Sequence, residues 1–275
     1  MGYAASIIMG LLLGLIGGGG SILTVPILVY LFGIHPVLST TYSLFVVGLT
    51  SLVGSYSHFK TGHVHVKTAL VFGVPSIISV YATRKFIMPV IPDPVFSIAS
   101  FTFTKPLFIM VLFAILMILA AVSMIRKSKI STDTAPEIKY NYPIIFLEGL
   151  LVGGITGLVG AGGGFLIIPA LVLLARLPMK QAVGTSLLII ALKSLVGFTG
   201  DLDSGYIINY TFLFMFSAFA VAGILAGSYL ARFISGNKLK VVFGWFVLVM
   251  GTYILGKEKK KKKRGMLLQH FVHKV

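Results

Sequence analysis

The sequence is short of charged residues and of cysteine, and each shortage excludes a class of protein. Only 11 % of the 275 residues are charged, against about 25 % in an ordinary soluble domain. The mean hydropathy is +1.00, which argues against a soluble, disordered or collagen-like chain. Because there is no cysteine, the chain forms no disulfide and offers no thiolate nucleophile or thiolate metal ligand.

Acidic residues are the scarcest charged type, with 7 Asp and Glu against 23 Lys and Arg, which gives a net charge of +16. The basic residues are unevenly placed: none precedes Lys60, and seven lie within Lys257–Arg264. Cations confined to loops and a tail around an apolar body are typical of a membrane protein. We therefore expect a multi-pass protein of the cell (inner) membrane, with the lipid bilayer and not nucleic acid as its partner.

Several catalytic signatures are missing from the sequence. It contains no Walker A motif, no Gly-x-Ser-x-Gly elbow and no His-Glu-x-x-His motif, which are the marks of ATP hydrolysis, of serine hydrolases and of zinc proteases. His58, His63 and His65 are not spaced to share one helix face. We expect a protein that is not an enzyme and that has no catalytic residue, metal or cofactor.

Long apolar segments predict an all-α polytopic membrane protein. A membrane-spanning helix needs about 20 apolar residues, and the sequence offers eight such segments. They are Tyr3–Phe32, Thr41–Tyr56, Lys67–Met88, Pro106–Ile125, Tyr142–Ala175, Val183–Thr199, Ile207–Phe233 and Leu239–Leu255. The first and fifth are too long for one simple helix, and each has a glycine cluster at its middle.

The chain also contains two copies of one unit. Shifting the first half by 143 residues aligns Gly14–Pro26 with Gly157–Pro169, and Ser51–Gly54 with Ser194–Gly197, without a gap. A match that includes Gly, Pro and Ser indicates an internal duplication. The predicted organisation is a first membrane repeat over 1–125, a basic linker over 126–141, a second repeat over 142–256 and a Lys-rich tail over 257–275.

Two membrane topologies fit these segments. If every segment crosses once, the repeats are parallel, and the linker and the tail lie on one side. If the two glycine-broken segments re-enter, each half crosses three times, the halves are inverted, and the linker and the tail lie on opposite faces. The clustering of Lys and Arg in the linker and the tail favours eight crossings.

The two glycine clusters are the strongest pointer to a functional site. Gly17–Gly20 and Gly160–Gly164 precede Pro26 and Pro169, and such a run of glycines unwinds a helix. Unwound backbone is tolerated in a membrane where it is buried or lines a cavity, and the helix that follows presents a partly positive N-terminus to an anion. Interrupted segments at matching places in two halves are typical of transporters. The alternative is close helix packing through glycine.

Polar residues near these breaks are further candidates. Ser43 in one half, and Thr185 and Ser186 in the other, open the second segment of each repeat. Their hydroxyls either cap the helix or bind a small anion. Lys193 lies in the middle of an apolar segment, where a cation faces a cavity or a partner; it either pairs with a substrate anion or forms a salt bridge.

Three other ionisable residues lie at segment ends. Glu148 is near the start of its segment, and His58 and Asp201 are equivalent positions of the two repeats. Proton coupling is one interpretation of His58 and Asp201, and a solvated loop end is the other.

The duplicated pattern Gly-x-x-Gly-x-Gly-Gly followed by Pro, at Gly14–Pro26 and Gly157–Pro169, resembles the sulfite exporter TauE/SafE family, also grouped as 4-toluene sulfonate uptake permeases. The resemblance covers most of residues 3–255. It implies a membrane protein that moves sulfur-containing or organic anions such as sulfite, sulfonates or sulfoacetate, bound between the repeats near the helix breaks. The sequence departs from its own symmetry at Lys193, because Thr50 stands at the equivalent place.

Together these observations predict a secondary transporter of a small anion. The alternative is an integral membrane protein without transport activity, either an intramembrane enzyme or its partner subunit. The candidate substrate-binding residues are Gly17, Gly18, Gly19, Gly20, Ser21, Ser43, Gly160, Gly162, Gly163, Gly164, Thr185, Ser186 and Lys193.

Overall fold

A computed structural model describes residues 2–98, 101–125, 142–173, 175, 177–202, 205, 207–231, 233 and 244–257. The predicted linker over 126–141 and nearly all of the predicted tail over 257–275 lie outside these residues. The described chain is helical apart from a two-stranded antiparallel sheet of β1 (Phe96–Ile98) and β2 (Phe101–Phe103).

The helices follow the predicted apolar segments. They are α1 (Gly2–Ile16), the 3-10 turn η1 (Gly18–Leu23), α2 (Thr24–Pro26), the π turn η2 (Ile27–Leu31), α3 (Pro36–Lys60), α4 (Val66–Ala82), the π turn η3 (Thr83–Ile87), α5 (Met88–Val90), α6 (Lys105–Ile125), α7 (Tyr142–Val159), α8 (Gly164–Leu173), α9 (Met179–Thr199), α10 (Tyr210–Leu230) and a last helix at Gly244–Lys257.

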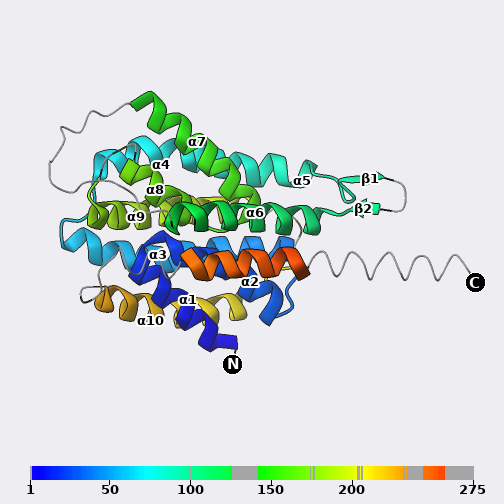
Figure 1. Ribbon diagram of the computed structural model, residues 1–275, viewed down its shortest axis with the longest axis horizontal. Helices are drawn as coiled ribbons and strands as arrows, with labels where there is room; N and C mark the ends of the chain where they lie inside the picture. Colours follow the sequence, from blue (N-terminus) through cyan, green and yellow to red (C-terminus); the bar gives the residue numbers. More distant parts are fainter. Residues whose placement is uncertain are drawn as a thin grey trace, which may run out of the picture.

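By length and composition, five described helices can cross a membrane: α3, the continuous run α4–η3–α5, α6, α9 and α10. Figure 1 shows them lying along the long axis of the molecule. We call the end that carries β1 and β2 the β-hairpin end, and the end that carries the loop between α3 and α4 the Thr61 end. The last helix packs beside α6, since a side chain at Gly251 would meet Met117 and Ile118.

The first glycine-broken segment turns back on itself. Tyr3 at the start of α1 and Phe32 just after η2 meet edge to face, with ring centroids 5.8 Å apart. Near the turn, a Cβ at Gly20 would lie 2.2 Å from the backbone nitrogen of Leu13. Residues 2–32 therefore form a helical hairpin that enters and leaves at the β-hairpin end (Figure 1), which we call hairpin 1.

The second glycine-broken segment forms a matching hairpin, which we call hairpin 2. Helix α7 runs parallel to α4, because Gly149 packs on Phe72 and Gly157 packs on Thr83; like α4, it begins at the Thr61 end. Helix α9, which follows α8, also begins there, where the Thr185 hydroxyl accepts a hydrogen bond from the His65 backbone N–H. Residues 142–178 thus enter and leave at the Thr61 end, as Figure 1 shows for their described part.

The predicted arrangement of eight single crossings is therefore wrong, and the re-entrant alternative is the one observed. The two hairpins open toward opposite ends, so elements 143 residues apart run in opposite directions. Helix α6 ends and α7 begins at the Thr61 end, whereas the last helix ends at the β-hairpin end, where Lys257 lies 4.1 Å over the ring of Tyr30. The described residues that flank the linker therefore lie at the opposite end of the molecule from Lys257, where the tail begins.

Glycines outside the turns allow backbones to approach closely. On α1, a Cβ at Gly10 would lie 2.0 Å from the carbonyl oxygen of Ala220 in α10, and Gly223 and Gly227 face α1 in return. On α7, Gly153 packs on the Ser76 carbonyl of α4. Small residues four apart are typical of helix contacts in membranes. Close packing thus accounts for these glycines, which lie outside the hairpin turns.

Candidate functional site

The turns of the two hairpins meet inside the protein. A Cβ at Gly18 would lie 2.1 Å from the Cα atom of Gly164, and a Cβ at Gly164 would lie 2.0 Å from the Cα atom of Gly18. Both residues are buried. The two glycine clusters, far apart in sequence, are therefore brought into direct backbone contact at the centre of the molecule.

The turns use a backbone conformation that side chains resist. Gly17 has a φ of 77°, and Gly160, Gly162 and Gly163 have φ values of 71°, 64° and 69°. This left-handed region costs a residue with a side chain roughly 1–2 kcal/mol. The clusters interrupt the helices, as predicted, and allow the chain to reverse before η1 begins at Gly18 and α8 begins at Gly164.

Lys193 lies against the turn of hairpin 2. Its side chain comes from the middle of α9 and is 1 % exposed. The ammonium Nζ donates to the hydroxyl of Thr156 on α7 at 2.9 Å, and it would be 2.8 Å from a Cβ at Gly163. Among the described residues no carboxylate lies within 4.0 Å of it. An isolated buried ammonium is strongly disfavoured, so this one is suited to a counter-anion.

The predicted hydroxyls differ in what they do. The Ser21 hydroxyl donates to the Gly18 carbonyl at 2.7 Å, and the Ser186 hydroxyl donates to the Val183 carbonyl at 2.8 Å. Thr185 is held by the His65 backbone at 2.9 Å. These three have structural partners, whereas the buried Ser43 hydroxyl has none among the described residues.

Three residues near the turns escaped prediction. Thr156 holds the ammonium of Lys193, and the hydroxyls of Ser51 and Ser194 are fully buried without a hydrogen-bond partner among the described residues. The oxygen of Ser194 would lie 3.5 Å from a Cβ at Gly162. The alignment of Ser51 with Ser194 in the two repeats was the available signal.

A buried ionic cluster lies beside the turn of hairpin 2. Asp201 accepts from Nη1 of Arg84 at 3.1 Å and from the Thr41 hydroxyl at 2.7 Å, and the same nitrogen donates to Thr40 at 3.0 Å. Thr40 in turn touches Gly160, whose Cβ would lie 2.4 Å away. Asp201 is 5 % exposed, so the interpretation of this residue as a solvated loop end is wrong.

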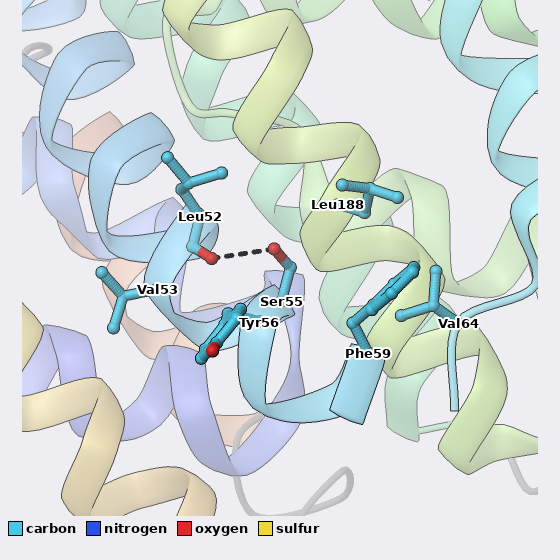
Figure 2. Close-up of a pocket in the computed structure, with 7 residues that line it drawn as sticks. All are labelled: Leu52, Val53, Ser55, Tyr56, Phe59, Val64 and Leu188. Carbon is cyan, nitrogen blue, oxygen red and sulfur yellow. Dashed lines mark hydrogen bonds between the residues drawn. The ribbon is translucent and has the colours of Figure 1, made fainter. Parts of the chain in front are cut away.

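A groove of about 440 Å³ lies away from these residues, between α3 and α9 near the Thr61 end. Figure 2 shows its lining, which is largely apolar: Leu52, Val53, Ser55, Tyr56, Phe59, Val64 and Leu188. The Ser55 hydroxyl is occupied, because it donates to the Leu52 carbonyl at 2.9 Å. No predicted binding residue lines this groove, and none of its lining residues is charged.

Two opposed helical hairpins between apolar helices, with a buried cation where they meet, are typical of membrane transporters. The sulfite exporter TauE/SafE family model matches residues 3–254. The chain belongs to this family.

Curated relatives agree with this assignment. The chain is 28 % identical over 257 residues to a probable membrane transporter protein of Xylella fastidiosa, covering 90 % of this chain and 91 % of the relative. It is 30 % identical over 263 residues to one of Methanocaldococcus jannaschii, covering 90 % and 92 %, and 27 % identical to one of Bacillus subtilis, covering 93 % and 98 %. No solved structure matches the chain. It is a multi-pass membrane transporter and not an enzyme.

Proposed function

We propose that the protein is a secondary transporter of small sulfur-containing or organic anions of the sulfite, sulfonate or sulfoacetate type, bound near the two hairpin turns. The observation that carries the proposal is the buried ammonium of Lys193, which has a single hydroxyl partner among the described residues. A bound anion would supply the charge that this ammonium lacks. The family name, which refers to sulfite export, supports the same class of substrate.

The opposed hairpins suggest how such an anion would move. In inverted transporters, the two halves exchange conformations around a central site, so that the site opens to one face and then to the other. The turns are buried from both ends in the described structure, which corresponds to a closed state of this cycle. Since the sequence has no Walker A motif, an ion or substrate gradient would drive transport.

Flux measurements in proteoliposomes test this function. We expect purified protein to carry radiolabelled sulfite, a sulfonate or sulfoacetate, and we expect Lys193→Met to lower this flux at least tenfold while the folded protein is still recovered. Lys180→Met is the matched control, because Lys180 is an exposed residue in the first turn of the same helix. Absence of flux for all three anions, with and without a pH gradient, would contradict the proposal.

A further inference from the structure

Two consecutive residues of α9 lie over two consecutive glycines of the hairpin 2 turn. The ammonium of Lys193 would be 2.8 Å from a Cβ at Gly163, and the hydroxyl oxygen of Ser194 would be 3.5 Å from a Cβ at Gly162. Neither glycine has a Cβ, so both polar groups reach the turn backbone itself. The cation and the hydroxyl therefore each border a residue of the same turn.

The polar groups there have unused hydrogen-bonding capacity. Ser194 is 0 % exposed and its hydroxyl has no partner among the described residues. An ammonium has three donors, and Lys193 uses one of them on Thr156. Buried polar groups are nearly always hydrogen-bonded in native proteins, so an unpaired hydroxyl beside an underused ammonium indicates a place for a ligand.

The equivalent region of hairpin 1 differs in charge. Thr50 and Ser51 stand where the second repeat has Lys193 and Ser194. Thr50 carries no charge, and its hydroxyl is spent on the Val46 carbonyl at 2.6 Å. The Ser51 hydroxyl is buried and unpartnered, as in the other half. An anion thus finds a hydroxyl at both turns but a cation at only one.

The space midway between the two turns is closed. The backbones of Gly18 and Gly164 touch there, and the Ile190 side chain would lie 2.7 Å from a Cβ at Gly18. An anion that sat symmetrically between the turns would have to separate these backbones. On the hairpin 2 side of this contact, the ammonium of Lys193 supplies the positive charge.

We propose that Lys193 and Ser194 bind two oxygens of one oxyanion on the hairpin 2 side of the turns, so that the site is one-sided. This inference deepens the proposed function and rests on it. Thr156 holds the ammonium in position, and the N-terminus of α8 at Gly164 adds partial positive charge from a helix of 10 residues. The ligand class is an anion with at least two acceptor oxygens, such as a sulfonate or sulfite, and not a halide.

Anion binding to the purified, detergent-solubilised protein tests the role of Ser194. The probes are methanesulfonate and sulfite, measured by calorimetry with potassium chloride as the halide comparison. Since a hydrogen bond to a charged group is a strong one, we expect Ser194→Ala to weaken binding of the oxyanions at least tenfold, and chloride at equal concentration not to compete. The affinity of Ser194→Cys, which keeps a weak donor of similar size, should lie between that of the wild type and that of Ser194→Ala.

Ser217→Ala is the matched control. Ser217 is also fully buried with an unpartnered hydroxyl, but its neighbour Phe216 packs on Phe32, at the open end of hairpin 1. We expect this variant to bind as the wild type does. Ser51→Ala should lose less affinity than Ser194→Ala, because no cation accompanies Ser51.

The outcomes separate this inference from the function on which it rests. Wild-type affinity in Ser194→Ala, with flux retained, would overturn the role of Ser194 and leave the transporter assignment intact. Equal losses in Ser51→Ala and Ser194→Ala would overturn the one-sided site. If the wild-type protein neither binds nor carries either oxyanion, the proposed function fails as well.

Discussion

Replacing Gly18 with alanine tests whether the hairpin turns meet as closely as described. The new Cβ would lie 2.1 Å from Gly164 Cα and 2.6 Å from its carbonyl carbon. Non-bonded carbons rest about 3.5–4.0 Å apart, so the two backbones must separate by about 1.5 Å. No side chain can yield at this contact, since both atoms belong to the backbone. Because φ at Gly18 is outside the left-handed region, packing alone sets the cost.

Overpacking a buried contact costs about 1–3 kcal/mol. In a protein of this size, roughly 1 kcal/mol corresponds to a change of about 2–4 °C in Tm, so Gly18→Ala should lower Tm by about 2–12 °C. Thermal unfolding of the purified protein in detergent measures this change in Tm.

Gly73→Ala is the control for this substitution. Gly73 is a buried glycine of α4 whose nearest neighbour would be an Ile189 carbon at an ordinary 3.7 Å. Alanine stabilises a helix interior by up to about 1 kcal/mol relative to glycine, so the Tm of this variant should stay level or rise. If Gly18→Ala unfolds at the same temperature as Gly73→Ala, the contact between the turns is refuted.

Two further predictions concern the topology and the buried ion pair. In the cysteine-free chain, single cysteines at the exposed positions Thr61 and Ile207 should react with an impermeant maleimide from opposite faces of sealed vesicles; labelling from one face would restore the eight-crossing arrangement. Removing one partner of a buried ion pair costs about 3–5 kcal/mol, so Arg84→Met should lower Tm strongly. Arg84→Met combined with Asp201→Leu should recover part of this loss in a double-mutant cycle, whereas strictly additive losses would argue against the pair.

The apolar segments and their breaks could be predicted from sequence because both are local properties. A run of apolar residues predicts a helix in a membrane, and Gly17–Gly20 predicts its interruption. The direction of the chain after the break is not local, since fifteen apolar residues look the same whether they continue or return. The reversal depends on contacts between distant residues, such as Tyr3 with Phe32.

The positive charges favoured the wrong topology for the same reason. The linker and the tail are both basic, and counting them together assumed that they share a face. The described helices place the residues that flank the linker at the Thr61 end and Lys257 at the β-hairpin end. Charge counting orients a set of spans only when the number of crossings between the charges is known.

The candidate site could be predicted in part. Lys193 was recognisable because a lone cation within an apolar segment is rare, and the glycine clusters stood out by composition. Ser194 was not recognisable from sequence, since the hydroxyl of a serine in a membrane helix usually donates to the helix's own backbone. Thr185 was predicted as a binding residue, but its hydroxyl accepts a hydrogen bond from the backbone of His65, 120 residues away in sequence. No local sequence pattern reveals that contact.

The Arg84–Asp201 pair lies at one end of a molecule built from two opposed halves. The equivalent positions of the other half are Gly227 and His58, and because glycine has no side chain this pair is not repeated there. Two identical halves would make the states open to either face equal in free energy. A pair that is not repeated at the equivalent positions makes them unequal, and each 1.4 kcal/mol of difference shifts the ratio of the two states about tenfold. The transporter is therefore expected to rest with its β-hairpin end shut, and to expose its site first at the Thr61 end.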